Sequence, residues 1–238
     1  MKDEALYVVI PAYNEEENIE NVINDWYPVV ERYGSLESRL VIVDDGSKDA
    51  TYTIAQKWRE TKPLLEVFSK ENEGHGATLM WGYRYALDQK ADYIFQTDSD
   101  GQTTPEEFSE FWENRKQYHI IIGDRSSRKD GWKRVFVARV LRTVIRIMFG
   151  VKAQDVNTPY RLMQAETLRG LLGYIPDKCP LTNVVMTAVY LKKEKRVKFI
   201  PISFSARQKG TNSINLTKII KLGMASLREF HQINKSIK

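Results

Sequence analysis

Residues 93–102 read YIFQTDSDGQ and place two acidic residues directly after a short apolar run. The run Tyr93–Gln96 predicts a buried strand. Asp98 and Asp100 are separated by one residue, so their side chains share a face in an extended segment. Carboxylate oxygens are ligands that Mg²⁺ and Mn²⁺ prefer. Many such pairs are only solvated turns or helix caps, but the position at a strand end favours a metal site here.

Strand-like and helix-like segments alternate on both sides of this stretch. This alternation predicts an α/β fold, Rossmann-like, with a mostly parallel sheet and helices on both faces. The strands are expected at Leu6–Ile10, Leu40–Val43, Leu64–Phe68, Tyr93–Gln96 and His119–Ile122, and the helices at Glu15–Arg32, Asp49–Glu60, Gly76–Gln89 and Pro105–Lys116.

The second half of the chain has a different character. Lys133–Phe149 is a basic, apolar segment that predicts a helix, with its arginines on one face. Arg196–Ile202 predicts a late strand. Leu216–Ile233 has the spacing of an amphipathic helix. We therefore expect one domain over residues 1–215 and a C-terminal amphipathic helix over 216–238, which either binds a membrane surface or packs on the domain.

Bulk composition narrows the class of protein. The chain has 238 residues, of which 42% are hydrophobic, enough for one large domain with a real core. Its single cysteine, Cys179, excludes an internal disulfide. No apolar run approaches the ~20 residues that cross a bilayer, and no N-terminal signal is visible. The formal charge of +5 favours acidic partners such as phosphates or anionic lipid without singling out nucleic acid.

Polar residues follow three of the expected strands: Tyr13-Asn14-Glu15, Asp44-Asp45-Gly46-Ser47 and Asp98-Ser99-Asp100. Ligands of open α/β sheets bind beyond the carboxyl ends of the strands, so these clusters are expected to form one site. The Asp44-Asp45 turn has two interpretations. It caps the next helix, or one carboxylate accepts a hydrogen bond from a nucleobase or ribose.

Two further groups of residues suit phosphate. Asn72–Gly76 contains two glycines before a helix N-terminus, a weak phosphate-loop signal in which His75 is an ordinary loop residue. Arginine matches phosphate oxygens bidentately, although any one arginine also fits a solvated basic face. The candidate arginines are Arg125, Arg134, Arg139, Arg161 and Arg207.

Taken in order, these motifs resemble the family-2 glycosyltransferases of the GT-A fold, and more narrowly the polyprenyl-phosphate sugar transferases related to dolichyl-phosphate mannose synthase. The resemblance covers nearly the whole chain. Pro159 departs from the glycine usual in its segment, and His75 stands where a lysine is commoner. The motifs are Ile10–Glu15, Val43–Asp49, Asn72–Ala77, Asp98–Gln102, Gly123–Arg125, Asp155–Leu162 and Ile200–Ile202 followed by Arg207–Asn215.

The resemblance implies roles for particular residues. The metal, Mg²⁺ or Mn²⁺, is expected at Asp98 and Asp100, which with Asp155 and Arg207 form the expected catalytic set. The nucleotide-sugar donor is expected to meet Pro11, Ala12, Tyr13, Glu15, Asp44, Asp45, Gly76, Asp98, Ser99, Asp100, Gln102, Arg207 and Ser213. The acceptor phosphate is expected to meet Arg125, Arg134, Arg139 and Arg161.

The expected reaction is inverting transfer of a hexose from a GDP- or UDP-linked donor to a dolichyl- or undecaprenyl-type phosphate. One alternative is transfer to a saccharide or other hydroxyl, which needs a general base. Asp155 is that base, or it orients an arginine. A less favoured alternative is a nucleotide-sugar-binding protein without turnover. The expected location is cytoplasmic and peripheral at the cytoplasmic face of a membrane, with a separate membrane partner as another route of attachment.

Overall fold

The computed structural model describes residues 3–125, 132–205, 227 and 229–237. The expected roles of Arg207 and Ser213 lie outside these residues, and so does the side chain of Arg134. Most of the helix expected over Leu216–Ile233 lies outside them as well.

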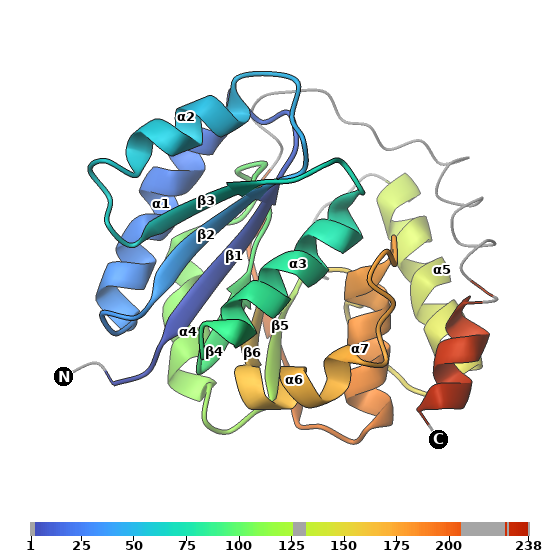
Figure 1. The fold of residues 1–238 in the computed structure, drawn as a ribbon. Coiled ribbons are helices and arrows are strands. Elements are labelled where there is room, and N and C mark those ends of the chain that lie inside the picture. The colour runs from blue at the N-terminus through green and yellow to red at the C-terminus, as the bar shows by residue number, and fades with distance from the viewer. Residues whose placement is uncertain (1–2, 126–131, 206–226, 228, 238) are drawn as a thin grey trace.

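The described residues contain one seven-stranded sheet with the order β3-β2-β1-β4-β6-β5-β7 (Figure 1). β1 to β4 run parallel, and β5 runs parallel to β7. β6 is antiparallel to both β4 and β5. The expected mostly parallel α/β sheet is therefore confirmed. The strands are β1 Leu6–Ala12, β2 Arg39–Asp44, β3 Leu65–Ser69, β4 Tyr93–Gln96, β5 Ile120–Asp124, β6 Arg161–Gln164 and β7 Val197–Pro201.

Helices cover both faces of this sheet (Figure 1). One face packs against α1 (Ile19–Tyr33), α2 (Thr51–Trp58) and α4 (Phe108–Asn114), which follows the short 3₁₀ turn η1 (Pro105–Glu107). The other face packs against α3 (His75–Asp88), α5 (Trp132–Phe149), α6 (Ala165–Leu172) and α7 (Thr182–Lys192).

Burial on both faces explains why the strands read as apolar runs. In β1, Leu6, Val8 and Ile10 belong to the core under α1, while Tyr7 and Val9 belong to the core under α3. This alternation follows the two-residue period of a strand. A strand buried on both faces has no polar side, so its sequence is continuous in hydrophobicity.

Three elements were not expected from the sequence: β6, α6 and α7. The helix expected from Glu15 begins only at Ile19, because residues 15–18 form a turn with Asn18 and Ile19 donating to the carbonyl of Glu15. Likewise, the helix expected over Pro105–Lys116 starts as the 3₁₀ turn.

The C-terminal segment is helical over residues 229–236. Phe230, Ile233 and Ile237 are buried in the core beside α5, and the rings of Phe149 and Phe230 lie 5.8 Å apart. This part of the expected amphipathic helix packs on the domain. Within the described residues, no helix combines the length and the apolar character that crossing a bilayer requires.

Candidate functional site

The carboxyl ends of β1, β2 and β4 meet at one edge of the sheet, and the polar loops after them are joined by hydrogen bonds. The Ser99 hydroxyl donates to the carbonyl of Pro11 at 2.8 Å. The Asp45 N–H donates to the carbonyl of Ala12 at 2.8 Å. The expected grouping of the three polar clusters is thus observed, with Asp98 and Asp100 directly beyond β4.

Asp98 is electrostatically unusual. Burial raises the pKa of its carboxyl to about 6, with a further rise from Asp100 against the opposing charges of His75 and Arg125. Its buried Oδ1 has no hydrogen-bond partner among the described residues and lies 3.8 Å from His75 Nε2. An unsatisfied buried carboxylate oxygen is costly, and a cation would relieve that cost.

The carboxylates of Asp98 and Asp100 therefore suit a hard divalent cation, but they supply only some of the ligands that such an ion needs. Among the described residues, no group of three or more His, Cys, Asp or Glu is placed to hold an ion. Magnesium and manganese sites of this type usually complete their shell with water and substrate phosphate. The arrangement suits an ion that arrives with a phosphate-bearing substrate.

Gln102 connects the metal-motif loop to the chain after β7. Its side-chain amide donates to the carbonyl of Ser205 at 2.7 Å, and the Ser205 N–H donates to the carbonyl of Gln102 at 2.9 Å. Asp100 Oδ1 accepts from the Gln102 N–H at 3.1 Å. The amide nitrogen of Gln102 thus ties the metal-motif loop to the chain after β7.

At the end of β1, Pro11 and Ala12 are buried within the strand, and the Tyr13 side chain is exposed. Glu15 is buried, and its Oε2 accepts from the Asn18 side chain at 2.7 Å. The Glu15 N–H donates to the Thr51 hydroxyl at 2.8 Å, which fixes this loop to the start of α2. Of these residues, Tyr13 offers the most surface to a ligand.

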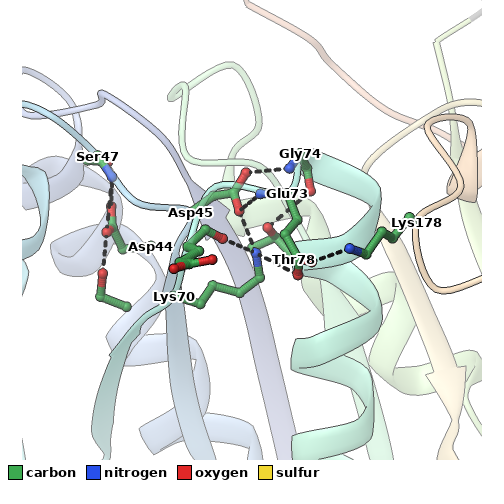
Figure 2. Close-up of polar contacts among 10 residues, drawn as sticks. Asp44, Asp45, Ser47, Lys70, Glu73, Gly74, Thr78 and Lys178 are labelled. Carbon is green, nitrogen blue, oxygen red and sulfur yellow. Dashed lines mark hydrogen bonds and ion pairs between the residues drawn. The ribbon is translucent and has the colours of Figure 1, made fainter.

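Asp44 and Asp45 are both buried and both hold neighbouring loops, as Figure 2 shows. Asp44 accepts from the Ser69 hydroxyl at 2.8 Å and from the Ser47 N–H at 3.2 Å. Asp45 accepts from Lys70 Nζ at 2.6 Å. Both carboxylates are therefore structural, but they hold loops and do not cap α2, whose N-terminus has no side-chain cap hydrogen bond.

Asp45 also binds the glycine loop (Figure 2). Its carboxylate accepts from the N–H groups of Glu73 and Gly74 at 3.0 and 2.8 Å. Burial alone would raise the pKa of Asp45, but Lys70 and these N–H groups outweigh it and hold the pKa low. In this structure a protein carboxylate binds the N–H groups of Glu73 and Gly74, which gives the glycine loop a structural role beside the weak phosphate-loop signal of its sequence.

Gly76 has a packing reason for lacking a side chain. A Cβ at this position would lie 1.9 Å from the carbonyl oxygen of Cys179, so only glycine lets α3 approach that loop. Glu73 and Lys178 form an ion pair of 2.5 Å that joins the same two segments. The expected contact of Gly76 with the donor thus has a competing structural explanation.

In the expected acceptor region, Arg125 and Asp155 form a bidentate ion pair. Arg125 Nε and Nη2 lie 2.9 and 3.2 Å from the two carboxylate oxygens, and the guanidinium lies over the ring of Phe204 at 5.1 Å. Burial would raise the pKa of Asp155, but the hydrogen bonds and charge of Arg125 hold it below its usual value. A carboxylate with a lowered pKa is a weak base, so Asp155 is suited to orienting Arg125.

Arg161 corrects another prediction. Its side chain is fully buried and donates to the carbonyls of Thr158 and Val156 and to the Thr187 hydroxyl, at 2.6, 2.9 and 2.9 Å. These bonds fix the segment after Asp155, and a guanidinium enclosed in this way does not reach an acceptor phosphate. Arg139, in contrast, is exposed on α5.

Two residues beside the site were not singled out as functional. Lys70 directly follows β3 at the same sheet edge, a position that strand-end reasoning would have found. His75, interpreted as an ordinary loop residue, places its Nε2 3.8 Å from the unsatisfied oxygen of Asp98. No pattern in the sequence indicates that its ring points toward that carboxylate.

Known proteins are similar to this chain over most of its length. A curated relative, undecaprenyl-phosphate mannosyltransferase from Micrococcus luteus, is 28% identical over 87% of this chain and 86% of its own. Polyprenol monophosphomannose synthase from Mycolicibacterium smegmatis is 25% identical over 89% of this chain and 82% of its own.

Solved structures share the fold. Glucosyl-3-phosphoglycerate synthase from Mycobacterium tuberculosis in complex with UDP has a TM-score of 0.67 at 20% identity, over 97% of this chain and 81% of that one. Another structure of that enzyme holds Mn²⁺ and UDP-glucose. At this identity the likeness shows a GT-A fold and nothing finer.

The family profile described as Glycosyl transferase family 2 matches residues 7–180, which include β1 to β6 and every polar cluster of the site that precedes α7. The match covers well over half of the chain. With the strand-end carboxylates and the GT-A sheet in place, this chain belongs to glycosyl transferase family 2.

Proposed function

We propose that this protein transfers a hexose from a GDP- or UDP-linked donor to a polyprenyl phosphate, with inversion at the sugar carbon and dependence on Mg²⁺ or Mn²⁺. The observation that carries the proposal is the pair Asp98 and Asp100 beyond β4, with a buried oxygen of Asp98 that has no hydrogen-bond partner among the described residues. Two relatives that match over 86% and 82% of their own length, named undecaprenyl-phosphate mannosyltransferase and polyprenol monophosphomannose synthase, support this acceptor class.

Asp98 and Asp100 hold the cation in this proposal. When bound, a divalent cation neutralises charge on the departing nucleoside diphosphate. Tyr13, exposed at the end of β1, contacts the donor base, and Glu15 and Asp44 position the loops around the base and ribose. Arg207 and Ser213 close over the diphosphate by resemblance to the family.

The state of Asp155 favours a phosphate acceptor over a hydroxyl. A hydroxyl must lose a proton, which calls for a general base whose pKa lies near the working pH. Asp155 is paired bidentately with Arg125, and its pKa is held low, so it removes a proton poorly. A lipid phosphate already carries a nucleophilic oxygen and needs only positioning, for which Arg125, Arg134 and Arg139 are the candidates.

The test is transfer to a short, water-soluble polyprenyl phosphate from a panel of GDP- and UDP-hexoses, with Mg²⁺ or Mn²⁺ and with chelator. We expect product from at least one donor, loss of product with chelator, and loss in Asp100→Ala. Asp177→Ala removes an exposed carboxylate that pairs with Arg84 on α3, and this matched control should keep full activity. Transfer to saccharides alone, or full activity in Asp100→Ala, would contradict the proposal.

A further inference from the structure

Helix α5 presents an unusual outer face. Val140 and Ile147 are seven residues apart, so they lie in one row along the helix, and their side chains are 42% and 75% exposed. Arg139 and Arg146 form a second exposed row directly beside the first. A surface helix normally turns its apolar residues inward, so an exposed apolar row next to a basic row requires an explanation.

The opposite side of α5 already fulfils the packing role. Leu141, Ile145 and Phe149 are buried in the core together with residues of α7 and the C-terminal segment. In the described part of the C-terminal segment, Phe230 and Ile233 are buried in the same core, while Leu227 is 38% exposed. α5 therefore carries an exposed apolar row in addition to its packed one.

The charge of α5 indicates the kind of partner. Its sequence, WKRVFVARVLRTVIRIMF, contains five basic residues and no acidic residue. A basic row bordering an apolar row is the composition of helices that lie in the plane of an anionic bilayer, with arginines at the headgroups and apolar side chains below them. A protein partner on the same face would need acidic residues to pair with the arginines. The exposed side chain of Ile147 favours an apolar environment instead, which the interior of a bilayer provides.

We infer that the outer face of α5, formed by Arg139, Val140, Arg146 and Ile147, docks the protein on an anionic membrane surface. The inference rests on the proposed function in one respect: a lipid acceptor lies in a bilayer, so the enzyme has to bind there to reach it. Arg125 directly follows β5, and α5 is the next element along the chain, so the proposed acceptor residues and the docking face belong to neighbouring segments of the sequence.

The experiment is flotation with vesicles of phosphatidylglycerol and phosphatidylcholine that contain no polyprenyl phosphate, over a series of salt concentrations. The wild-type chain should float with these vesicles at low salt and be released as salt rises. Ile147→Asp should weaken binding by tenfold or more, because it removes an inserted side chain and adds a repelled charge. Arg146→Glu should weaken it by a similar factor, since each basic residue near an anionic surface contributes about a fivefold gain.

Leu36→Asp is the matched control. Leu36 is more exposed than Ile147, at 86%, but it lies in the connection between α1 and β2, on the far side of the molecule from α5 (Figure 1). Its substitution should leave vesicle binding unchanged. Thermal unfolding of all three variants establishes that each is folded. We expect all three to fold, because the substituted side chains are exposed.

The outcomes separate this inference from the proposed function. Loss of vesicle binding in Ile147→Asp with unchanged transfer to a water-soluble acceptor supports both. Loss of binding in a protein that transfers to no polyprenyl phosphate supports the docking face and contradicts the function. Equal binding of Ile147→Asp, Leu36→Asp and wild type, or no salt-sensitive binding of the wild type at all, would overturn the docking face.

Discussion

At the scale of single residues, Arg161 determines the path of the chain between Asp155 and β6. Its guanidinium binds two carbonyls and one hydroxyl while fully enclosed by protein. Sequence reasoning assigned it to a phosphate, because an arginine in a ligand site and an arginine that holds a turn look alike in sequence. Only the burial of the side chain separates the two roles.

Arg161→Lys should destabilise the protein substantially. A lysine ammonium cannot reproduce the planar fork that reaches Val156 and Thr158 together, so at least one buried carbonyl loses its donor. We expect the free energy of unfolding to fall by about 2–5 kcal/mol, from a cost of roughly 1–3 kcal/mol per unsatisfied group. Thr187→Val, which removes one acceptor of the same guanidinium, should cost about 1–2 kcal/mol. Urea unfolding measures both, and a lysine variant as stable as wild type would contradict this account.

Asp155→Asn should show a stability defect that depends on pH. The pKa of Asp155 is lowered in the folded state, so its ionised form stabilises the fold above the unfolded value of about 3.9. That contribution is lost as pH falls through the folded pKa. The variant should therefore be less stable than wild type by about 2–3 kcal/mol at pH 7, with the gap closing below about pH 4. Urea unfolding at pH 7, 5 and 3 measures the gap, and a gap that stays constant to pH 3 would rule out the ion pair as its source.

At the scale of elements, β1, β2 and β4 were predictable because both of their faces are buried. β6 was missed because its sequence, RLMQ, begins with an arginine and offers only two consecutive apolar residues. α7 was missed for the opposite reason. Nine of its residues, Thr182–Tyr190, are buried, so it has no polar side and no helical period to detect. An element surrounded by core gives a weaker periodic signal than one at the surface.

Gly76→Ala should disrupt the contact between α3 and the loop before α7. The added Cβ would meet the Cys179 carbonyl at 1.9 Å, a backbone atom that cannot rotate away. We expect a loss of about 1–3 kcal/mol in the free energy of unfolding, as for other overpacked sites. Gly170→Ala in α6 meets nothing within 4 Å, so the better helix propensity of alanine should stabilise the protein by about 0.5–1 kcal/mol. Thermal unfolding of the two variants should give shifts of opposite sign, and a neutral Gly76→Ala would show that the loop yields.

At the scale of the whole molecule, the edge of the sheet that carries the site could be predicted from the sequence, because parallel strands present their carboxyl ends at the same edge. The hydrogen-bond partners of the side chains at that edge could not be predicted from the sequence. Asp45 binds Lys70 and two N–H groups of the glycine loop, contacts that depend on how neighbouring βα loops fold over one another. Sequence spacing places a carboxylate at the edge but does not say whether protein or ligand occupies it.

The C-terminal helix closes the core on the α5 side, and Phe230 should be its principal anchor. Phe230→Ala should lower the free energy of unfolding by about 3–5 kcal/mol, as for other buried phenylalanines. Leu227→Ala is the matched control, because Leu227 is 38% exposed near the same helix, and its substitution should change stability by about 0.5 kcal/mol or less. Denaturant unfolding measures both variants.

Cys179 provides a second readout of the same packing. Burial raises the pKa of its thiol to about 12, and the carboxyl of Glu229 on the C-terminal segment adds to that rise. The native thiol should therefore react slowly with iodoacetamide, which requires the thiolate. Phe230→Ala should accelerate labelling, because opening the helix exposes the thiol and removes Glu229, while Leu227→Ala should not. If Phe230 instead contacted lipid, its substitution would weaken vesicle binding and leave both stability and labelling unchanged, so the two measurements together distinguish a packed helix from a membrane-bound one.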